Sequence, residues 1–182
     1  MISAEERRAR ALLTRIAEPG DELLGRLLAA EGAIGTLNVI NSDAVPDSCP
    51  PDSRPADSGR GDPGRRFAAW RARLPDAEPE RLLSECDALG GRLVCPGDAE
   101  WPSQLDDLGD RRPYALWVRG DEDLRFSCLR SVAIVGSRSA TSYGVNVAAE
   151  MGAELADRKW TVVSSGVAMW IFHGIPQYHP AS

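Results

Sequence analysis

Gly136, Ser137 and Arg138 form a short loop between an apolar run and a segment with a helical pattern. The apolar run covers residues 131–135, and a second one, residues 160–164, follows the helical segment. This order predicts a strand–loop–helix–strand unit whose loop lies at the carboxyl end of a parallel strand. Gly136 lets the backbone turn and approach a ligand, amides at the helix start attract anions, and Arg138 adds a forked positive charge. The loop is therefore predicted to bind phosphate.

The loop alone does not define the kind of phosphate ligand. The dinucleotide pattern G-x-G-x-x-G is absent because the next glycine after Gly136 is Gly144, and the Gly-Lys-Ser/Thr ending of a P-loop is absent as well. A single glycine after a strand also occurs in ordinary turns. These residues by themselves leave two interpretations open: a phosphate site, or a tight turn with Arg138 facing solvent.

Several motifs in the second half of the chain have the order and spacing of one known family. They are the pair Trp101-Pro102 with Pro113, the run 115–120 ending in Arg-Gly, the run 132–138 reading Val-Ala-Ile-Val-Gly-Ser-Arg with Tyr143-Gly144, and the run 162–168 reading Val-Val-Ser-Ser-Gly-Val-Ala. Together they resemble the DNA-processing protein A family (DprA, also called Smf). The resemblance covers about residues 98–168 and is looser over the first forty residues.

This resemblance implies a fold and a function. The fold would be α/β, an incomplete Rossmann-like parallel sheet preceded by a small helical module of helix-hairpin-helix or sterile-alpha-motif type. The function would be binding of single-stranded DNA during natural transformation and loading of the RecA recombinase, without enzymatic activity or a cofactor. Residues that match the family's DNA-contacting motifs are Gly136, Ser137, Arg138, Tyr143, Gly144, Ser165 and Gly166.

The end of the chain departs from the family pattern. Trp170 and Phe172 stand where the family has Gly and Asp, and residues 169–182 contain no Asp, Glu, Lys or Arg. We expect an out-of-frame tail from a frameshifted or truncated gene, with impaired function and without the family's homodimer surface. His173 and His179 are not predicted to bind metal because their spacing suits no common ligand pair. A short aromatic interaction segment is the alternative for this tail.

Two other functional classes remain open. The first is a Rossmann-like nucleotide-binding enzyme of the phosphoribohydrolase type, although its Gly-Gly-x-Gly-Thr motif and catalytic Glu are not found here. The second is a nonfunctional gene fragment. No Ser-His-Asp set can be assembled without the histidines of the tail. A binding module is therefore favoured over an enzyme.

Charge and composition restrict the partners. The chain carries a net charge of −6, with 27 acidic and 21 basic residues, so DNA binding must depend on a local site rather than on a general basic field. The arginines nearest the loop in sequence are Arg111, Arg112, Arg119, Arg125, Arg130 and Arg138. No run approaches the roughly 18 apolar residues of a membrane helix, and no signal-peptide pattern begins the chain. We expect a cytoplasmic protein without membrane contact.

Local signals divide the chain into four parts. Residues 1–41 form a helical module, in which Ser3 and Asp21 cap two helices and Gly32 ends the second before a third short helical turn, residues 34–40. Residues 42–66 are rich in Pro, Gly, Ser and Asp and are predicted to be a disordered linker. Residues 67–168 begin the Rossmann-like domain, and residues 169–182 form the tail.

Within residues 67–168 the predicted elements are short. Phe67, Trp70 and Leu74 have helical spacing, and Pro79 begins another helix that ends before Gly90. Strands are predicted at residues 92–95 and 115–119, in addition to those that flank the loop. Residues 143–157 are predicted to form the crossover helix.

Overall fold

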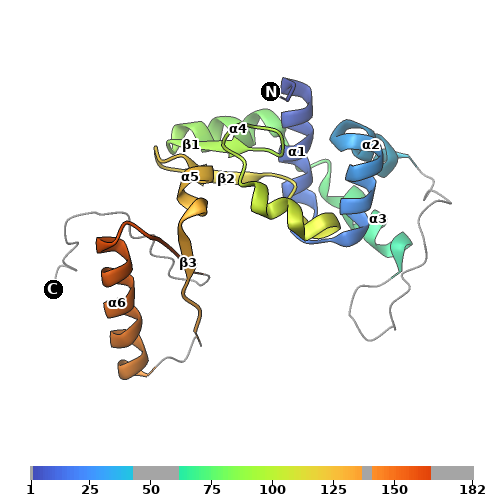
Figure 1. Ribbon diagram of the computed structural model, residues 1–182. Coiled ribbons are helices and arrows are strands. Elements are labelled where there is room, and N and C mark those ends of the chain that lie inside the picture. Colours follow the sequence, from blue (N-terminus) through green and yellow to red (C-terminus); the bar gives the residue numbers. More distant parts are fainter. Residues whose placement is uncertain (1, 43–61, 137–140, 165–182) are drawn as a thin grey trace. The chain divides into compact units, whose positions relative to one another are not determined.

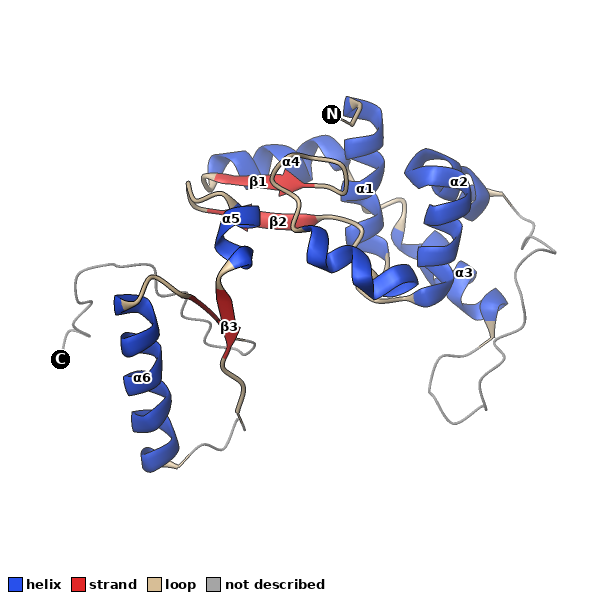
Figure 2. Cartoon of the chain, in the orientation of Figure 1, coloured by secondary structure: helices blue, strands red, loops and turns tan. Residues whose placement is uncertain are grey.

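The computed structural model describes residues 2–42, 62–136 and 141–164 (Figures 1 and 2). The chain forms two compact units, Met1–Asp121 and Glu122–Ser182, and each is described by itself. The first unit contains helices α1 to α4, strands β1 and β2 and the 3₁₀ segment η2; the second contains α5, β3, α6 and β4.

The first two helices begin at the predicted caps. In α1 (Ala4–Ile16) the Ser3 hydroxyl accepts a hydrogen bond from the Glu6 amide at 3.1 Å, and in α2 (Glu22–Asn41) the Asp21 carboxylate accepts one from the Leu24 amide at 3.0 Å. Gly32 interrupts α2 with a φ of 68°, a backbone conformation that favours glycine. The two predicted helices, the break at Gly32 and the helical segment after it are therefore confirmed.

Helix α3 (Pro63–Arg73) begins inside the predicted linker, so the linker boundary at residue 66 is wrong. The Asp62 side chain accepts a hydrogen bond from the Gly64 amide at 3.3 Å, and Pro63 suits the first helical turn because its fixed φ is helical. Asp and Pro are typical of disordered linkers, but they also occur at helix starts, as Asp62 and Pro63 do here. Composition therefore placed the end of the linker too late. Residues 43–61 lie outside the described part, so their predicted disorder stays a prediction.

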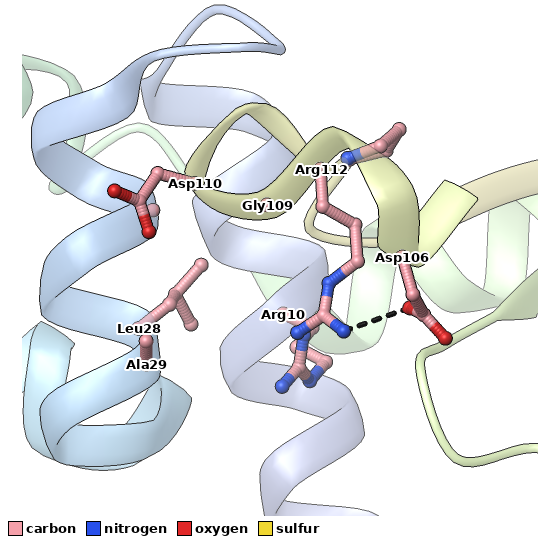
Figure 3. A pocket seen from close by; sticks show the side chains of 9 residues that line it. Arg10, Leu28, Ala29, Asp106, Gly109, Asp110 and Arg112 are labelled. Carbon is pink, nitrogen blue, oxygen red and sulfur yellow. Dashed lines mark hydrogen bonds and ion pairs between the residues drawn. The ribbon is translucent and has the colours of Figure 1, made fainter. Parts of the chain in front are cut away.

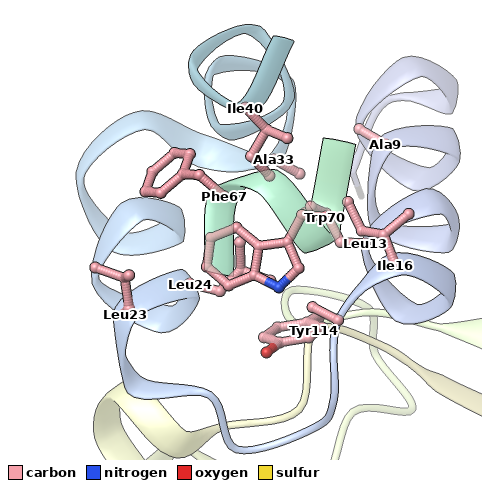
Figure 4. Close-up of a cluster of buried hydrophobic side chains, with 11 residues drawn as sticks. Ala9, Leu13, Ile16, Leu23, Leu24, Ala33, Ile40, Phe67, Trp70 and Tyr114 are labelled. Carbon is pink, nitrogen blue, oxygen red and sulfur yellow. The ribbon is translucent and has the colours of Figure 1, made fainter. Parts of the chain in front are cut away.

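Helix α3 packs into the core of the first unit. Phe67 is 0% exposed and Trp70 is 4% exposed, and their rings lie 5.2 Å apart between centroids. They join buried side chains of α1 and α2 together with Tyr114 (Figure 4). The cluster consists of Ala9, Leu13, Ile16, Ala17, Leu23, Leu24, Ala33, Ile40, Phe67, Trp70 and Tyr114. The compact unit thus extends to Asp121, whereas the sequence predicts a division at residue 67.

Strands β1 (Gly91–Val94) and β2 (Leu116–Arg119) occur where they are predicted but pair antiparallel, with Leu93 opposite Trp117. They lie in the first unit with α4 (Pro79–Ala88) and do not extend the parallel sheet. A parallel pair needs a crossover connection, usually an α-helix. The connection here contains only the 3₁₀ segment η2 (Ser103–Arg111), which accounts for the antiparallel pairing.

Arg7 ties α1 to the turn after β1. Its guanidinium donates two hydrogen bonds of 2.9 Å to the Asp98 carboxylate and one of 2.6 Å to the Leu93 carbonyl. The Cys95 amide also donates to Asp98 at 2.9 Å. Burial raises the pKa of Asp98, but the hydrogen bonds from Arg7 and Cys95 outweigh it, and the pKa of this carboxyl is lowered overall. The carboxylate is thus held in its charged form.

Asp98→Asn is expected to destabilise the first unit by about 1–2 kcal/mol at neutral pH, because Arg7 loses its charged partner. The lowered pKa means that the carboxylate contributes stability above its unfolded pKa of about 3.9, and that this contribution is lost as the pH falls through the lower folded value. Urea unfolding of both proteins at about pH 7 and about pH 3 measures the difference, which should shrink in acid. The exposed Asp107→Asn is the matched control. Equal stabilities at neutral pH would contradict the role of Asp98.

Helix α2 is the one described helix that is long and apolar enough, by length and composition, to cross a membrane. Gly32 breaks it at the middle, and Leu23, Leu24 and Ile40 are buried in the helical core. Packing within the first unit accounts for these buried side chains, and Leu27, Leu28 and Leu37 are partly buried against them.

The second unit is a β–α–β arrangement preceded by the short helix α5 (Leu124–Leu129). Strands β3 (Ser131–Ala133) and β4 (Thr161–Val163) pair in parallel, with Val132 opposite Val162, and α6 (Ser142–Asp157) connects them. Hydrogen bonds from the Thr161 amide to the Arg130 carbonyl at 2.9 Å and from the Ile134 amide to the Val163 carbonyl at 2.8 Å extend the ladder. The predicted strand–loop–helix–strand unit and the α/β fold are confirmed.

Candidate nucleic-acid interface

The loop predicted to bind phosphate follows β3 at the carboxyl edge of the parallel pair. Among the described residues, the hydrogen bond between Ile134 and Val163 is the last of the ladder, so β3 and β4 end at the same edge. In parallel α/β sheets ligands bind outside this edge. The fold therefore places the β3–α6 connection where such a site is expected.

The amino terminus of α6 presents free amides at this edge. The Thr141 hydroxyl caps the helix by accepting a hydrogen bond from the Gly144 amide at 3.2 Å, and the Thr141 carbonyl accepts from Val145 at 3.0 Å. The amides of Ser142 and Tyr143 belong to the first turn and have no acceptor within the helix. Such amides and the helix dipole attract anions. Thr141 was not predicted; a threonine directly before a helical pattern is the signal that would have identified it.

Gly136 lies between β3 and α6, in the described part of their connection. Its φ does not lie in the left-handed region, so the backbone does not require glycine there. A Cβ atom built on Gly136 would meet no atom of the described chain within 4 Å. Backbone geometry and crowding among the described residues thus give no reason for a glycine, and the predicted close approach of a ligand stays a prediction.

Tyr143 is the most exposed large hydrophobic residue of this region. Its side chain is 79% exposed, and that of Val135, just after β3, is 75% exposed. An exposed aromatic ring beside free helix amides can stack on a nucleic-acid base. Gly144 provides the amide that Thr141 caps.

The remaining predicted site residues lie outside the described part of the chain. They are Ser137, Arg138, Ser165 and Gly166. Their roles stay predictions. The structure brings Gly136, Tyr143 and Gly144 to the β3–α6 connection.

The arginines near the loop in sequence are divided between the two compact units. Arg111 pairs with Glu22 at 2.6 Å and Arg112 with Asp106 at 2.8 Å, both in the first unit. Arg119 also belongs to the first unit, and Arg125 and Arg130 to the second. The charges of Arg111 and Arg112 are thus already matched by carboxylates.

A cavity of about 220 Å³ in the first unit lies between α2 and η2 (Figure 3). Arg10 and Arg112 both face it, but Arg10 pairs with Glu6 at 2.9 Å and donates to the Tyr114 carbonyl at 2.9 Å. Hydrogen bonding from Arg112 lowers the pKa of Asp106, so the partner of Arg112 is also charged. These charges balance, and the cavity is a poor site for an anion.

The described residues offer little for covalent or metal chemistry. Burial raises the pKa of Cys95 to about 11 and also raises the pKa of Cys86 and Cys128. Protonated thiols are weak nucleophiles. Across residues 2–42, 62–136 and 141–164, no group of three or more His, Cys, Asp or Glu side chains could hold a metal ion. His173 and His179 lie outside these ranges.

Comparison with known proteins relates this chain to DNA-processing proteins. Residues 92–173 match the family of DNA recombination-mediator protein A. Two proteins of Mycobacterium tuberculosis (strains CDC 1551 / Oshkosh and ATCC 25618 / H37Rv), each described as a putative DNA processing protein DprA, are 38% identical over 102 residues. The aligned part covers 49% of this chain and 26% of each relative, so the chain spans about a quarter of their length. Over these residues the chain is similar to proteins of the DprA family.

The family match crosses the division between the two compact units. It begins at Arg92 in β1 and continues past β4, whereas the units meet at residues 121 and 122. It also ends at residue 173, five residues beyond the predicted end of the resemblance. The origin of residues 169–182 stays a prediction.

Proposed function

We propose that this chain binds single-stranded DNA as a DNA-processing protein of natural transformation and helps to load the RecA recombinase. It acts as a binding protein of the cytoplasm and not as an enzyme. The observation that carries the proposal is the family match over residues 92–173, which contains β3, its loop and the start of α6.

The geometry of the second unit supports binding to a phosphodiester chain. The Ser142 and Tyr143 amides attract a phosphate, and Gly136 leaves space for it beside the backbone. The exposed ring of Tyr143 offers a stacking surface that accepts any base. Phosphate contact plus stacking gives binding without a strong sequence preference.

Arg138→Ala is expected to weaken binding to oligo(dT) and to mixed-sequence oligomers alike. A phosphate contact carries no sequence information, and its loss reduces counterion release. For a single strand the slope of log K against log salt should fall by about 0.7 for one lost contact. Fluorescence anisotropy at several salt concentrations measures both quantities.

Arg112→Ala is the matched control, because it removes one arginine whose charge is already paired with Asp106. Equal affinity of the Arg138 variant and the parent would show that Arg138 makes no DNA contact. Absence of any binding to oligomers, together with binding of a mononucleotide, would favour the phosphoribohydrolase-like alternative. RecA loading is tested by RecA filament formation on strands coated with single-strand binding protein, which the chain should accelerate.

A further inference from the structure

Lys159 has a left-handed backbone conformation, the only one at a residue other than glycine in the described part of the chain. Its φ is 62°, and it follows the end of α6. The amides of Trp160 and Lys159 donate to the carbonyls of Leu155 and Ala156 at 2.9 Å each, which completes a Schellman motif with Lys159 at the position usually taken by glycine. Lys159 is also the single lysine of the chain. A strained position that keeps a charged side chain is a reason to look for a function.

A second cation lies at the same end of the unit. The Arg130 guanidinium lies over the Trp160 ring, 5.1 Å from its centroid. The Thr161 amide donates to the Arg130 carbonyl, so the backbone fixes Arg130 beside the residues that follow α6. This group, Arg130, Lys159 and Trp160, is called the basic–aromatic edge below. It lies where β3 and β4 begin, at the end of the strands opposite to the phosphate loop.

The charges of the basic–aromatic edge are exposed and lack an ion pair among the described residues. Arg130 and Lys159 are both exposed, and neither forms one of the ion pairs found there. The neighbouring Arg158, in contrast, pairs with Glu154. Arg7, Arg10, Arg111 and Arg112 of the first unit are also paired with carboxylates. Arg130 and Lys159 thus contribute two positive charges to this edge, with the exposed Asp157 two positions before Lys159, in a chain whose net charge is −6.

We propose that the basic–aromatic edge is a second contact surface for single-stranded nucleic acid, so that a bound strand touches both ends of the β3–β4 pair. This inference rests on the proposed function and adds to it the course of the bound DNA along the β3–β4 pair. Unpaired cations bind successive phosphates, and a ring that already stacks with a guanidinium can be shared with a base. Such charges also attract acidic protein segments, and the experiment below distinguishes this ligand class from DNA.

The test uses Lys159→Gly in the whole chain, because this change has opposite expected effects on stability and on binding. Glycine adopts the left-handed conformation without strain, so the melting temperature should rise. Loss of the cation should weaken binding to an oligo(dT) of about 20 nucleotides, which is longer than the ~4–16 nucleotides that one binding fold covers. The salt slope should fall by about 0.7. A purely structural role predicts the stabilisation without the loss of affinity.

Arg158→Ala is the matched control. Like Lys159→Gly it removes one positive charge, and it does so at the neighbouring residue, but the charge of Arg158 is already paired with Glu154. Arg138→Ala is measured beside it. If Arg138→Ala weakens binding while Lys159→Gly does not, the second surface is wrong and the proposed function stands. If the parent binds no oligomer, both are wrong. Equal losses in Lys159→Gly and Arg158→Ala would show a general charge effect. Direct binding of labelled polyglutamate that Lys159→Gly weakens, with DNA binding unchanged, would assign the edge to an acidic protein segment. Either result overturns the proposal.

Discussion

Phe67→Ala is expected to destabilise the first unit by about 3–5 kcal/mol. The Phe67 side chain is 0% exposed and contacts the Trp70 ring within the cluster formed by α1, α2 and α3. Alanine removes most of that apolar surface and leaves a cavity that neighbouring helices fill only in part. Urea unfolding followed by tryptophan fluorescence measures the change.

Phe126→Ala is the matched control, because it makes the same chemical change at a side chain that is 67% exposed. It should alter stability by no more than about 0.5 kcal/mol. If Phe67→Ala cost as little as Phe126→Ala, then α3 would not belong to the helical core, and the division predicted at residue 67 would be the better description.

Elements with local signals could be predicted from the sequence. Ser3 and Asp21 cap α1 and α2, and Gly32 breaks α2, because caps and left-handed glycines act within one helical turn. The apolar runs before and after α6 in the sequence predicted the parallel pair, because strands of parallel sheets are usually covered on both faces and are therefore continuously apolar.

Contacts between distant residues could not be predicted in this way. Arg7 and Asp98 are separated by 91 positions, and nothing in either neighbourhood specifies the other. The antiparallel pairing of β1 and β2 likewise depends on a connection that lacks an α-helix, which their own residues do not reveal. Phe67 was identified as an apolar helical position, but which core it joins depends on α1 and α2.

The elements around the candidate site were predicted, whereas the binding role of its residues stays a prediction. The sequence placed Gly136 and Tyr143 around the β3–α6 connection, and the structure places them there. The φ of Gly136, which does not lie in the left-handed region, could not be read from the sequence, and the Thr141 cap was missed. Arg130 was noted only as a charge and Lys159 was not singled out, since the contact of Arg130 with Trp160 and the left-handed φ of Lys159 depend on how α6 ends.

Gly25→Ala is expected to destabilise the first unit by about 2–3 kcal/mol, although alanine is the better helix former by about 1 kcal/mol. Gly25 lies within α2, and a Cβ atom there would be 1.8 Å from the Asp110 carbonyl oxygen and 2.6 Å from its carbonyl carbon. These are backbone atoms of η2, so the two segments would have to separate. The Arg111–Glu22 ion pair, which also joins η2 to α2, would be strained by the same movement. Urea unfolding gives the cost.

Gly152→Ala in α6 separates crowding from helix propensity. Gly152 is also a helical glycine, but a Cβ atom there would meet no described atom within 4 Å. Only propensity then acts, and this variant should be more stable by about 0.5–1 kcal/mol. Opposite signs for the two variants would show that the backbone of η2 is closely packed against α2 at Gly25. A stabilising Gly25→Ala would contradict that contact, and with it the position of η2 beside α2 and the cavity that these two segments line.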